Sequence, residues 1–175
     1  AKDLDEASSF KSAWEDFYHL KRWGYRKDQL VTTHPIEVPV PDTDFATSIF
    51  DGISYGKGSA ALKQLSYYVG GDEFLEGVQR YFMRYALRNT TTTDFMKMLS
   101  EASGKDLAKW QHTWLLTAGV NTVRAEWSCE APAGSDKPEL TRISKFALKQ
   151  SPSELNSELR THKTQLGLFY YGGKK

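Results

Sequence analysis

The sequence is poor in cysteine and contains no long apolar run. Cys129 is the only cysteine among 175 residues, so the chain cannot form an internal disulfide and carries no signature of an oxidising compartment. No stretch approaches the roughly 18 consecutive apolar residues that a membrane-spanning helix needs. We therefore expect a cytoplasmic protein with no membrane segment, in which Cys129 is a buried and inert thiol.

An excess of charge of either sign is also absent. The 23 Lys and Arg residues nearly balance the 22 Asp and Glu residues, which gives a formal net charge of +1. This balance provides no attraction for nucleic acid, and no basic cluster is long enough to favour an anionic membrane surface. Hydrophobic residues make up 39% and aromatic residues 13% of the chain, which is typical of a globular protein with a real core.

The part of the chain before Gly119 has the apolar spacing of helices. Residues 5–23 form one apolar face with a plausible stop at Gly24, and the three prolines within 25–43 predict an extended loop. The same reasoning predicts one short helix and four longer ones. The short helix is capped by Asp42 or Asp44 and ends at Phe50. Of the longer helices, the first runs from Tyr55 to Val69, the second is capped by Asp72, the third is capped by Thr93 or a neighbouring threonine, and the fourth runs from Asp106 to near Gly119.

The apolar pattern changes after Gly119. Alternation predicts strands around 120–127, 143–148 and 166–170. Three strands are few for a free-standing sheet. The predicted fold class is therefore mainly α, with a helical subdomain of about five helices at 1–119 and the beginning of a truncated β-sandwich domain at 120–175.

No active site is evident from motif spacing alone. The four histidines are His19, His34, His112 and His162, and none forms the His-Glu-x-x-His pair of a zinc protease helix. The sequence also lacks a Gly-x-Ser-x-Gly nucleophile elbow. The stretch 56–59 (GKGS) lacks the earlier glycine of a phosphate loop.

Six blocks of the sequence nevertheless resemble, in order, one family of zinc proteases. Residues 49–59 (IFDGISYGKGS) resemble the FDxISYxKG block of the M1, or gluzincin, aminopeptidases, and residues 31–36 (VTTHPI) resemble the family's TTHPI loop. The other four blocks are 10–23, similar to the helix after the third zinc ligand; 92–107, similar to TxxDFxxxLxxxSGxDL; 114–121, similar to WLxTAGxN; and 159–169, similar to LRPHxxxIGLY, with Thr161 in place of proline.

The resemblance implies an aminopeptidase N-like parent that removes N-terminal amino acids from peptides. In the family, the His-Glu-x-x-His helix, the downstream glutamate ligand and a Gly-x-Met-Glu-Asn loop all precede this segment. We therefore expect the chain to be a fragment, the C-terminal part of the catalytic domain plus the start of the following β-domain. Zinc is expected in the full-length parent but not in this fragment, which we expect to be inactive and to self-associate through uncovered apolar faces.

One site residue carries over from the family, Tyr55. By resemblance, its phenol donates a hydrogen bond to the oxyanion of the tetrahedral intermediate, while zinc-activated water attacks and an absent glutamate is the base. The resemblance assigns no substrate-binding residue and no metal ligand in this chain. Of the neighbours, Gly56 and Gly58 are expected to allow close backbone approach, Lys57 to pair with a carboxylate such as Asp51, and His34 to make a loop-fixing hydrogen bond.

Two other readings of the sequence remain open. The chain is alternatively a non-enzymatic helical interaction module derived from an aminopeptidase, which an open reading frame without an upstream His-Glu-x-x-His would favour. It is otherwise a plain structural domain, in which Tyr55 only contributes packing and its hydroxyl is buried against apolar groups.

Overall fold

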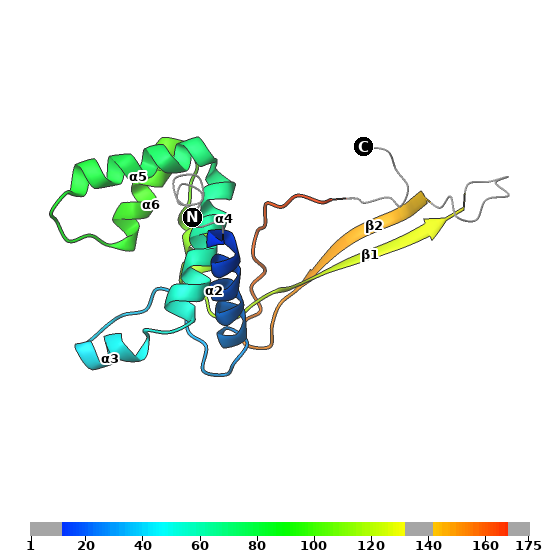
Figure 1. The fold of residues 1–175 in the computed structure, drawn as a ribbon, viewed down its shortest axis with the longest axis horizontal. Coiled ribbons are helices and arrows are strands. Elements are labelled where there is room, and N and C mark those ends of the chain that lie inside the picture. The colour runs from blue at the N-terminus through cyan, green and yellow to red at the C-terminus, as the bar shows by residue number, and fades with distance from the viewer. Residues whose placement is uncertain (1–11, 132–141, 168–175) are drawn as a thin grey trace. The chain divides into compact units, whose positions relative to one another are not determined.

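The computed structural model describes residues 12–131 and 142–167, and within these ranges it is mainly helical (Figure 1). The elements are α2 (Ala13–Lys27), α3 (Thr43–Ser48), a π-helical turn η1 (Ile53–Lys57), α4 (Gly58–Val69), α5 (Gly71–Tyr85), α6 (Thr92–Ser103), α7 (Ala108–Leu115), β1 (Thr122–Glu130) and β2 (Arg142–Ser151). This confirms the predicted class, a helical region followed by a few strands. The β-sandwich stays a prediction.

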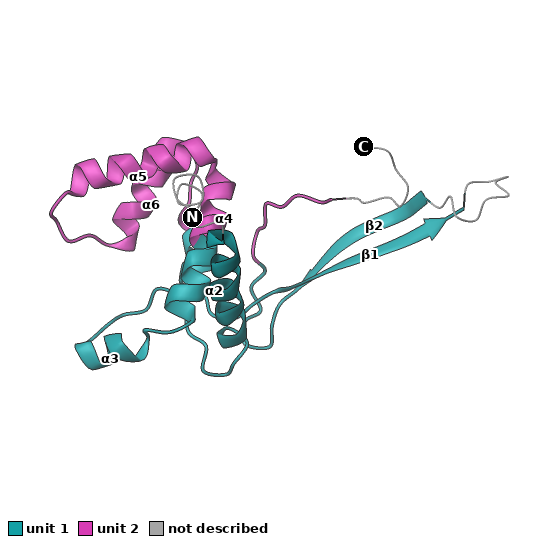
Figure 2. Ribbon diagram, in the orientation of Figure 1, with its two compact units in different colours: residues 1–61, 111–159 teal, residues 62–110, 160–175 magenta. Residues whose placement is uncertain are grey.

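The chain divides into two compact units (Figure 2). Unit 1 consists of residues 1–61 and 111–159, and unit 2 consists of residues 62–110 and 160–175. Unit 1 contains α2, α3, η1 and both strands, whereas unit 2 contains most of α4 together with α5 and α6. The predicted domain division at residue 119 stays a prediction.

Helix α2 of unit 1 continues through Gly24 and ends at Lys27, so the predicted stop at Gly24 is wrong. Gly24 is buried, and a Cβ there would lie 2.5 Å from the backbone nitrogen of Lys57. The glycine is therefore a packing residue and not a helix terminator. Acidic residues in the first turn and basic residues in the last turn of α2 complement the helix dipole. Phe10 and the start of the predicted helix lie outside the described residues.

The core of unit 2 is formed by apolar side chains of α4 and α6, of Leu107 before α7 and of Trp110 in α7, while α5 contributes the buried Gly77. Its buried residues are Leu65, Val69, Met96, Met98, Leu99, Leu107 and Trp110. Helices α5 and α6 approach closely at Gly77, where a Cβ would lie 2.6 Å from Leu99 Cδ2. Because glycine is the smallest residue, Gly77 lets the two helices pack directly around Leu99.

The ends of the unit 2 helices follow ordinary capping chemistry. Thr91 and Asp94 form a reciprocal capping box at the start of α6, as the predicted threonine cap implies, and Gly104 ends α6 in the left-handed region at φ +65°. The N-cap of α5 is Gly70 and not the predicted Asp72. Gly70 has φ +121°, which is not helical, so α5 begins at Gly71 and Asp72 lies in its first turn.

Strands β1 and β2 of unit 1 form an antiparallel hairpin. Their pairs alternate between an apolar face, with Ala125 opposite Leu148 and Trp127 opposite Phe146, and a polar face. Every residue of β1 is exposed, because no second layer packs on the apolar face within the described residues. For the same reason Cys129 is exposed, and the prediction of a buried thiol is wrong.

The third predicted strand is not seen in the part of it that the structure describes. Leu166 lies in a stretch with no regular secondary structure, and Leu168 and Tyr170 lie outside the described residues. Apolar alternation alone therefore over-predicted this strand at Leu166.

Candidate functional site

Tyr55 lies in the middle of η1, a π-helical turn that precedes the α-helix α4. Its backbone N–H donates to the Asp51 carbonyl at 3.0 Å, and the Lys57 N–H donates to the Gly52 carbonyl at 2.9 Å. The predicted α-helix from Tyr55 therefore begins at Gly58, with the π turn before it. Such turns are rare and occur frequently at functional sites.

The Tyr55 side chain is accessible to solvent. It is 42% exposed, and its ring contacts the exposed Phe50 ring at a centroid distance of 4.4 Å. Within the described ranges, its hydroxyl forms no hydrogen bond. A tyrosine that serves only as packing would instead be buried, so the exposure disfavours the purely structural reading of Tyr55.

The N-terminal side of the turn is held by the Asp51 carboxylate. Asp51 Oδ1 accepts the backbone N–H groups of Ile53, at 2.8 Å, and Ser54, at 3.1 Å. Asp51 Oδ2 lies 3.4 Å from His34 Nε2. These bonds satisfy N–H groups that the start of any helical turn leaves without an intrahelical acceptor.

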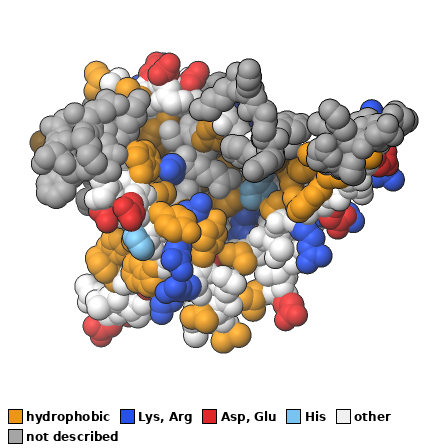
Figure 3. All heavy atoms as spheres, turned by 45° about the vertical axis from the view of Figure 1, so that its right-hand side comes forward, with side chains coloured by type: hydrophobic (Ala, Val, Ile, Leu, Met, Phe, Trp, Pro, Cys, Tyr) orange, Lys and Arg blue, Asp and Glu red, His pale blue; other side chains and the backbone are white. Residues whose placement is uncertain are grey.

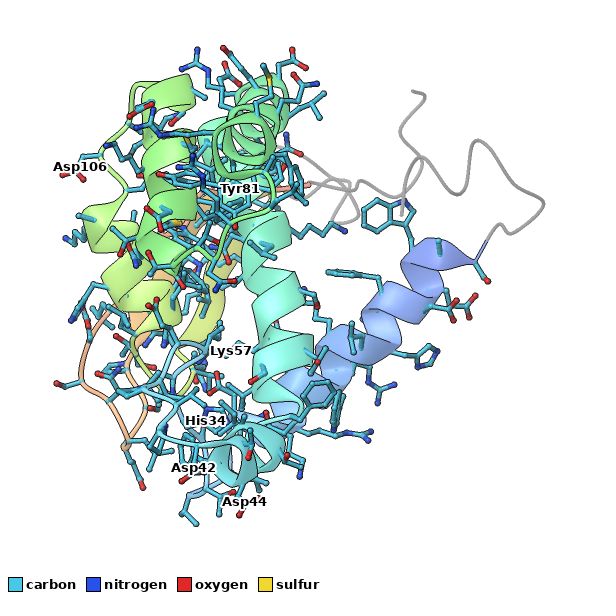
Figure 4. The ribbon with its side chains drawn as sticks, turned by 90° about the vertical axis from the view of Figure 1, so that its left-hand side faces the viewer. His34, Asp42, Asp44, Lys57, Tyr81 and Asp106 are labelled. Atoms are coloured by element: carbon cyan, nitrogen blue, oxygen red, sulfur yellow. The ribbon has the colours of Figure 1, made fainter. Side chains whose placement is uncertain are left out.

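His34 connects its own loop to this turn. Its Nδ1 lies 2.7 Å from the Pro35 carbonyl oxygen, to which a protonated Nδ1 donates, and its Nε2 faces Asp51. The predicted loop-fixing hydrogen bond of His34 is therefore confirmed. Both His34 and Lys57 lie beside the start of α4 (Figure 4).

The C-terminal side of the turn is held by a buried ion pair. Lys57 Nζ lies 2.9 Å from Asp28 Oδ2, and the two side chains are only 12% and 4% exposed. Lys57 Nζ also donates to the carbonyl oxygens of Thr117, at 3.3 Å, and Gly119, at 3.5 Å. The prediction that Lys57 pairs with a carboxylate is confirmed, but its partner is Asp28 because Asp51 caps the start of the turn.

Asp28 was not identified by sequence reasoning. Besides Lys57, its Oδ1 accepts the Thr33 hydroxyl at 2.7 Å and the Gly119 N–H at 3.0 Å. One signal was available, because Asp28 directly follows α2 at the helix C-cap, where the helix dipole disfavours a carboxylate. An acidic residue at that position indicates that a partner elsewhere in the chain compensates its negative charge.

The turn packs on α2 through two glycines. A Cβ on Gly56 would lie 2.7 Å from both the Gly24 nitrogen and the Leu20 carbonyl oxygen. Only glycine at both positions allows this backbone-to-backbone approach. The expectation for Gly56 is therefore confirmed, whereas that for Gly58 is wrong, because a Cβ on Gly58 would make only ordinary contacts, the nearest being 3.7 Å from Ile36.

The described residues form no cluster of metal ligands. They contain no group of three or more His, Cys, Asp or Glu side chains that could hold a metal ion. His112 Nδ1 lies 3.6 Å from Glu158, separate from the His34–Asp51 pair. Burial, and then the positive charge of Arg160, lower the pKa of His162.

Among the helices described, none has the length and apolar character needed to cross a membrane.

Comparison with known proteins identifies the same family along most of the chain. A family model described as the peptidase family M1 domain matches residues 2–114. Aminopeptidase N of Streptomyces lividans is 39% identical over 173 residues, which make up 95% of this chain and 19% of that protein.

Two further relatives match shorter parts of the chain. The tricorn protease-interacting factor F2 of Thermoplasma volcanium is 37% identical over 124 residues, 70% of this chain and 16% of that protein. Aminopeptidase 2 of Candida albicans is 43% identical over 99 residues, 57% of this chain and 11% of that protein. The chain thus spans less than a fifth of the length of each of these three relatives.

Proposed function

This chain belongs to peptidase family M1, and from that premise we propose that it is part of an aminopeptidase in which Tyr55 stabilises the reaction's oxyanion. The relatives named aminopeptidase support a parent protein that releases N-terminal amino acids from peptides. The observation that carries the role of Tyr55 is its exposed phenol on a π turn whose two ends are fixed by Asp51 and Lys57.

The chemistry of a phenol fits this role. When a peptide bond is hydrolysed, negative charge grows on the carbonyl oxygen in the tetrahedral intermediate, and a preorganised hydrogen-bond donor stabilises that charge. A tyrosine hydroxyl has a reference pKa of about 10 and is therefore a neutral donor near pH 7. Tyr55 is 42% exposed and has no acceptor for its hydroxyl among the described residues, which supports a proton that is available to a substrate.

Zinc is the metal that the family resemblance implies, and the described residues do not fit a zinc site because they contain no cluster of three ligands. We propose that the full-length protein binds zinc through residues outside the described ranges and that the isolated chain hydrolyses no peptide. Incubation of the purified chain with an aminoacyl-coumarin substrate tests this. Zinc-dependent turnover that is lost in Tyr55→Phe would contradict it.

The role of Tyr55 is tested in the full-length protein. Tyr55→Phe keeps the ring and removes the donor, so kcat for an aminoacyl-coumarin is expected to fall by about 10²–10³. The matched control is Tyr67→Phe, because Tyr67 is a tyrosine of similar exposure, 40%, in α4, and its kcat should stay within about twofold. An unchanged kcat in Tyr55→Phe would overturn the proposed role of Tyr55, whereas a full-length protein that hydrolyses no aminoacyl-coumarin would favour the non-enzymatic interaction module.

Self-association of the isolated chain is part of the same proposal. Trp14, Tyr18 and Tyr25 are exposed on α2, and Trp127 is 63% exposed in β1, and hydrophobic side chains lie beside charged ones on the surface (Figure 3). Exposed apolar patches commonly associate. Light scattering of the chain should therefore give a mass that rises with concentration. A strictly monomeric chain would contradict this expectation.

A further inference from the structure

The η1 turn has one buried side and one exposed side. Lys57 points into unit 1, where its ammonium contacts Asp28 and two carbonyl oxygens. Tyr55, two residues earlier, is 42% exposed and contacts Phe50. The residue proposed to act on substrate is therefore attached to a turn whose opposite side is fixed by charge.

The bonds of the ammonium determine where that side of the turn lies. A lysine ammonium has three protons, and among the described residues Nζ lies within hydrogen-bond distance of Asp28, Thr117 and Gly119. Asp28 in turn accepts the Thr33 hydroxyl and the Gly119 N–H. A buried charge that leaves its partner loses its compensation for desolvation, so the pair fixes the distance between Lys57 and the end of α2.

Backbone packing removes the remaining freedom of the turn. Gly56 contacts Gly24 backbone to backbone, which sets the separation between η1 and α2. Asp51 fixes the start of the turn through the Ile53 and Ser54 N–H groups. Asp51 holds the start of the turn, Gly24 contacts its middle and Asp28 holds its end. The turn therefore presents the Tyr55 side chain in a direction set by α2.

We propose that Lys57 and Asp28 are positioning residues for Tyr55. Their ion pair orients the π turn so that the phenol lies where the oxyanion forms, and this inference rests on the proposed function of Tyr55. Neither residue touches the substrate. Because the pair acts on the geometry of a transition-state contact, its loss lowers kcat and leaves KM nearly unchanged. A displacement of about 1 Å at such a contact can cost about 10²-fold in rate.

The test is a cycle of variants in the full-length protein, with kcat and KM measured on an aminoacyl-coumarin. Lys57→Met removes the charge and keeps the length of the side chain, and we expect kcat to fall by about 10- to 100-fold with KM within about threefold. In the Tyr55→Phe background, Lys57→Met should change kcat by less than about threefold, because no donor remains to be positioned. Equal losses of kcat in both backgrounds would overturn the inference.

A second variant separates positioning from folding. Lys57→Met leaves the Asp28 carboxylate buried without its cation, whereas Lys57→Met with Asp28→Asn removes both charges and keeps an acceptor for Thr33 and Gly119. We expect this double variant to regain most of the Tm lost in Lys57→Met while its kcat stays at least about tenfold below that of the unmodified enzyme. Recovery of kcat in parallel with Tm would overturn the inference.

A matched control is provided by the exposed ion pair of α5. Arg80 and Glu76 pair one turn apart on the helix surface, and Arg80→Met should leave kcat within about twofold. The two proposals fail separately. Full activity in Tyr55→Phe removes the proposed oxyanion role of Tyr55, whereas a large loss in Tyr55→Phe with additive effects of Lys57→Met removes only the positioning role.

Discussion

The η1 turn of unit 1 and the α5–α6 pair of unit 2 solve the same packing problem in two ways. Each brings two segments together at a glycine, Gly56 against Gly24 in unit 1 and Gly77 against Leu99 in unit 2. Around Gly77 the neighbours are apolar and buried, whereas the η1 turn is fixed by the Lys57–Asp28 ion pair. Apolar packing is non-directional, but charged hydrogen bonds specify an orientation.

The difference indicates that the η1 turn of unit 1, and not the α5–α6 pair of unit 2, fixes the direction of a side chain. In unit 2, the α5–α6 contact at Gly77 is made with the side chain and backbone of Leu99, which carry no charge. In unit 1, any shift of Lys57 separates it from acceptors on two different segments, Asp28 at the end of α2 and the Thr117 and Gly119 carbonyls after α7. A buried ion pair is weak evidence for stability, so its presence beside Tyr55 is better explained by orientation.

The largest expected effect on stability comes from breaking that pair on one side. Lys57→Met should lower the free energy of unfolding of the chain by about 3–5 kcal/mol, because it leaves a buried carboxylate uncompensated. Arg80→Met removes the exposed pair of unit 2 and should cost no more than about 1 kcal/mol. Urea unfolding of both variants measures the difference. Equal losses would mean that the Lys57–Asp28 pair is not buried as the structure has it.

A smaller effect is expected from adding a methyl group at each glycine contact. In Gly24→Ala the new Cβ would lie 2.5 Å and 2.7 Å from backbone atoms of Lys57 and Gly56, which cannot move independently. In Gly77→Ala the closest atom, at 2.6 Å, is the end of the Leu99 side chain, although its Cα lies at 3.0 Å.

We therefore expect Gly24→Ala to cost about 3 kcal/mol and Gly77→Ala about 1–2 kcal/mol, both by overpacking. The gain in helix propensity from glycine to alanine, at most about 1 kcal/mol, offsets part of each loss equally. Thermal unfolding of the two single variants compares them directly. A greater loss in Gly77→Ala would reverse the comparison between the two regions.

Much of the fold was predictable from local sequence signals. Apolar periodicity indicated the helices and two of the strands, and Asp42, which caps α3, was one of the two caps expected from short-range chemistry. These features depend on neighbours a few residues apart, which the sequence lists side by side. The errors arose where tertiary contacts decide, as at Gly24, whose role depends on Gly56 and Lys57.

The candidate site was only partly predictable for the same reason. Tyr55 was identified through family resemblance, and the pairing of Lys57 was expected but assigned to the nearby Asp51. The true partner, Asp28, lies 29 residues away in the sequence, and no local pattern reports such a distance. The exposure of Cys129 was missed because apolar alternation predicts a buried face only when a second layer covers it.

The smallest expected effect on stability concerns Asp94 at the start of α6. Its carboxylate accepts the backbone N–H and the hydroxyl of Thr91, both at 2.9 Å, and the Tyr85 hydroxyl at 3.2 Å. The backbone N–H of Thr91 is the main cause that lowers the pKa of Asp94 below its ordinary value of 3.8. The folded chain therefore favours the ionised carboxylate.

A lowered pKa in the folded state fixes the direction of the pH dependence. The stabilisation by Asp94 is complete above its unfolded pKa, near 3.8, and is lost as the pH falls through the lower pKa of the folded state. Asp94→Asn removes this titration, so the difference in urea midpoint between the unmodified chain and Asp94→Asn should shrink as the pH is lowered from 5 to about 2. A difference that stays constant across that range would show that Asp94 does not act through its charge, and the capping of α6 would then be as insensitive to pH as its apolar packing.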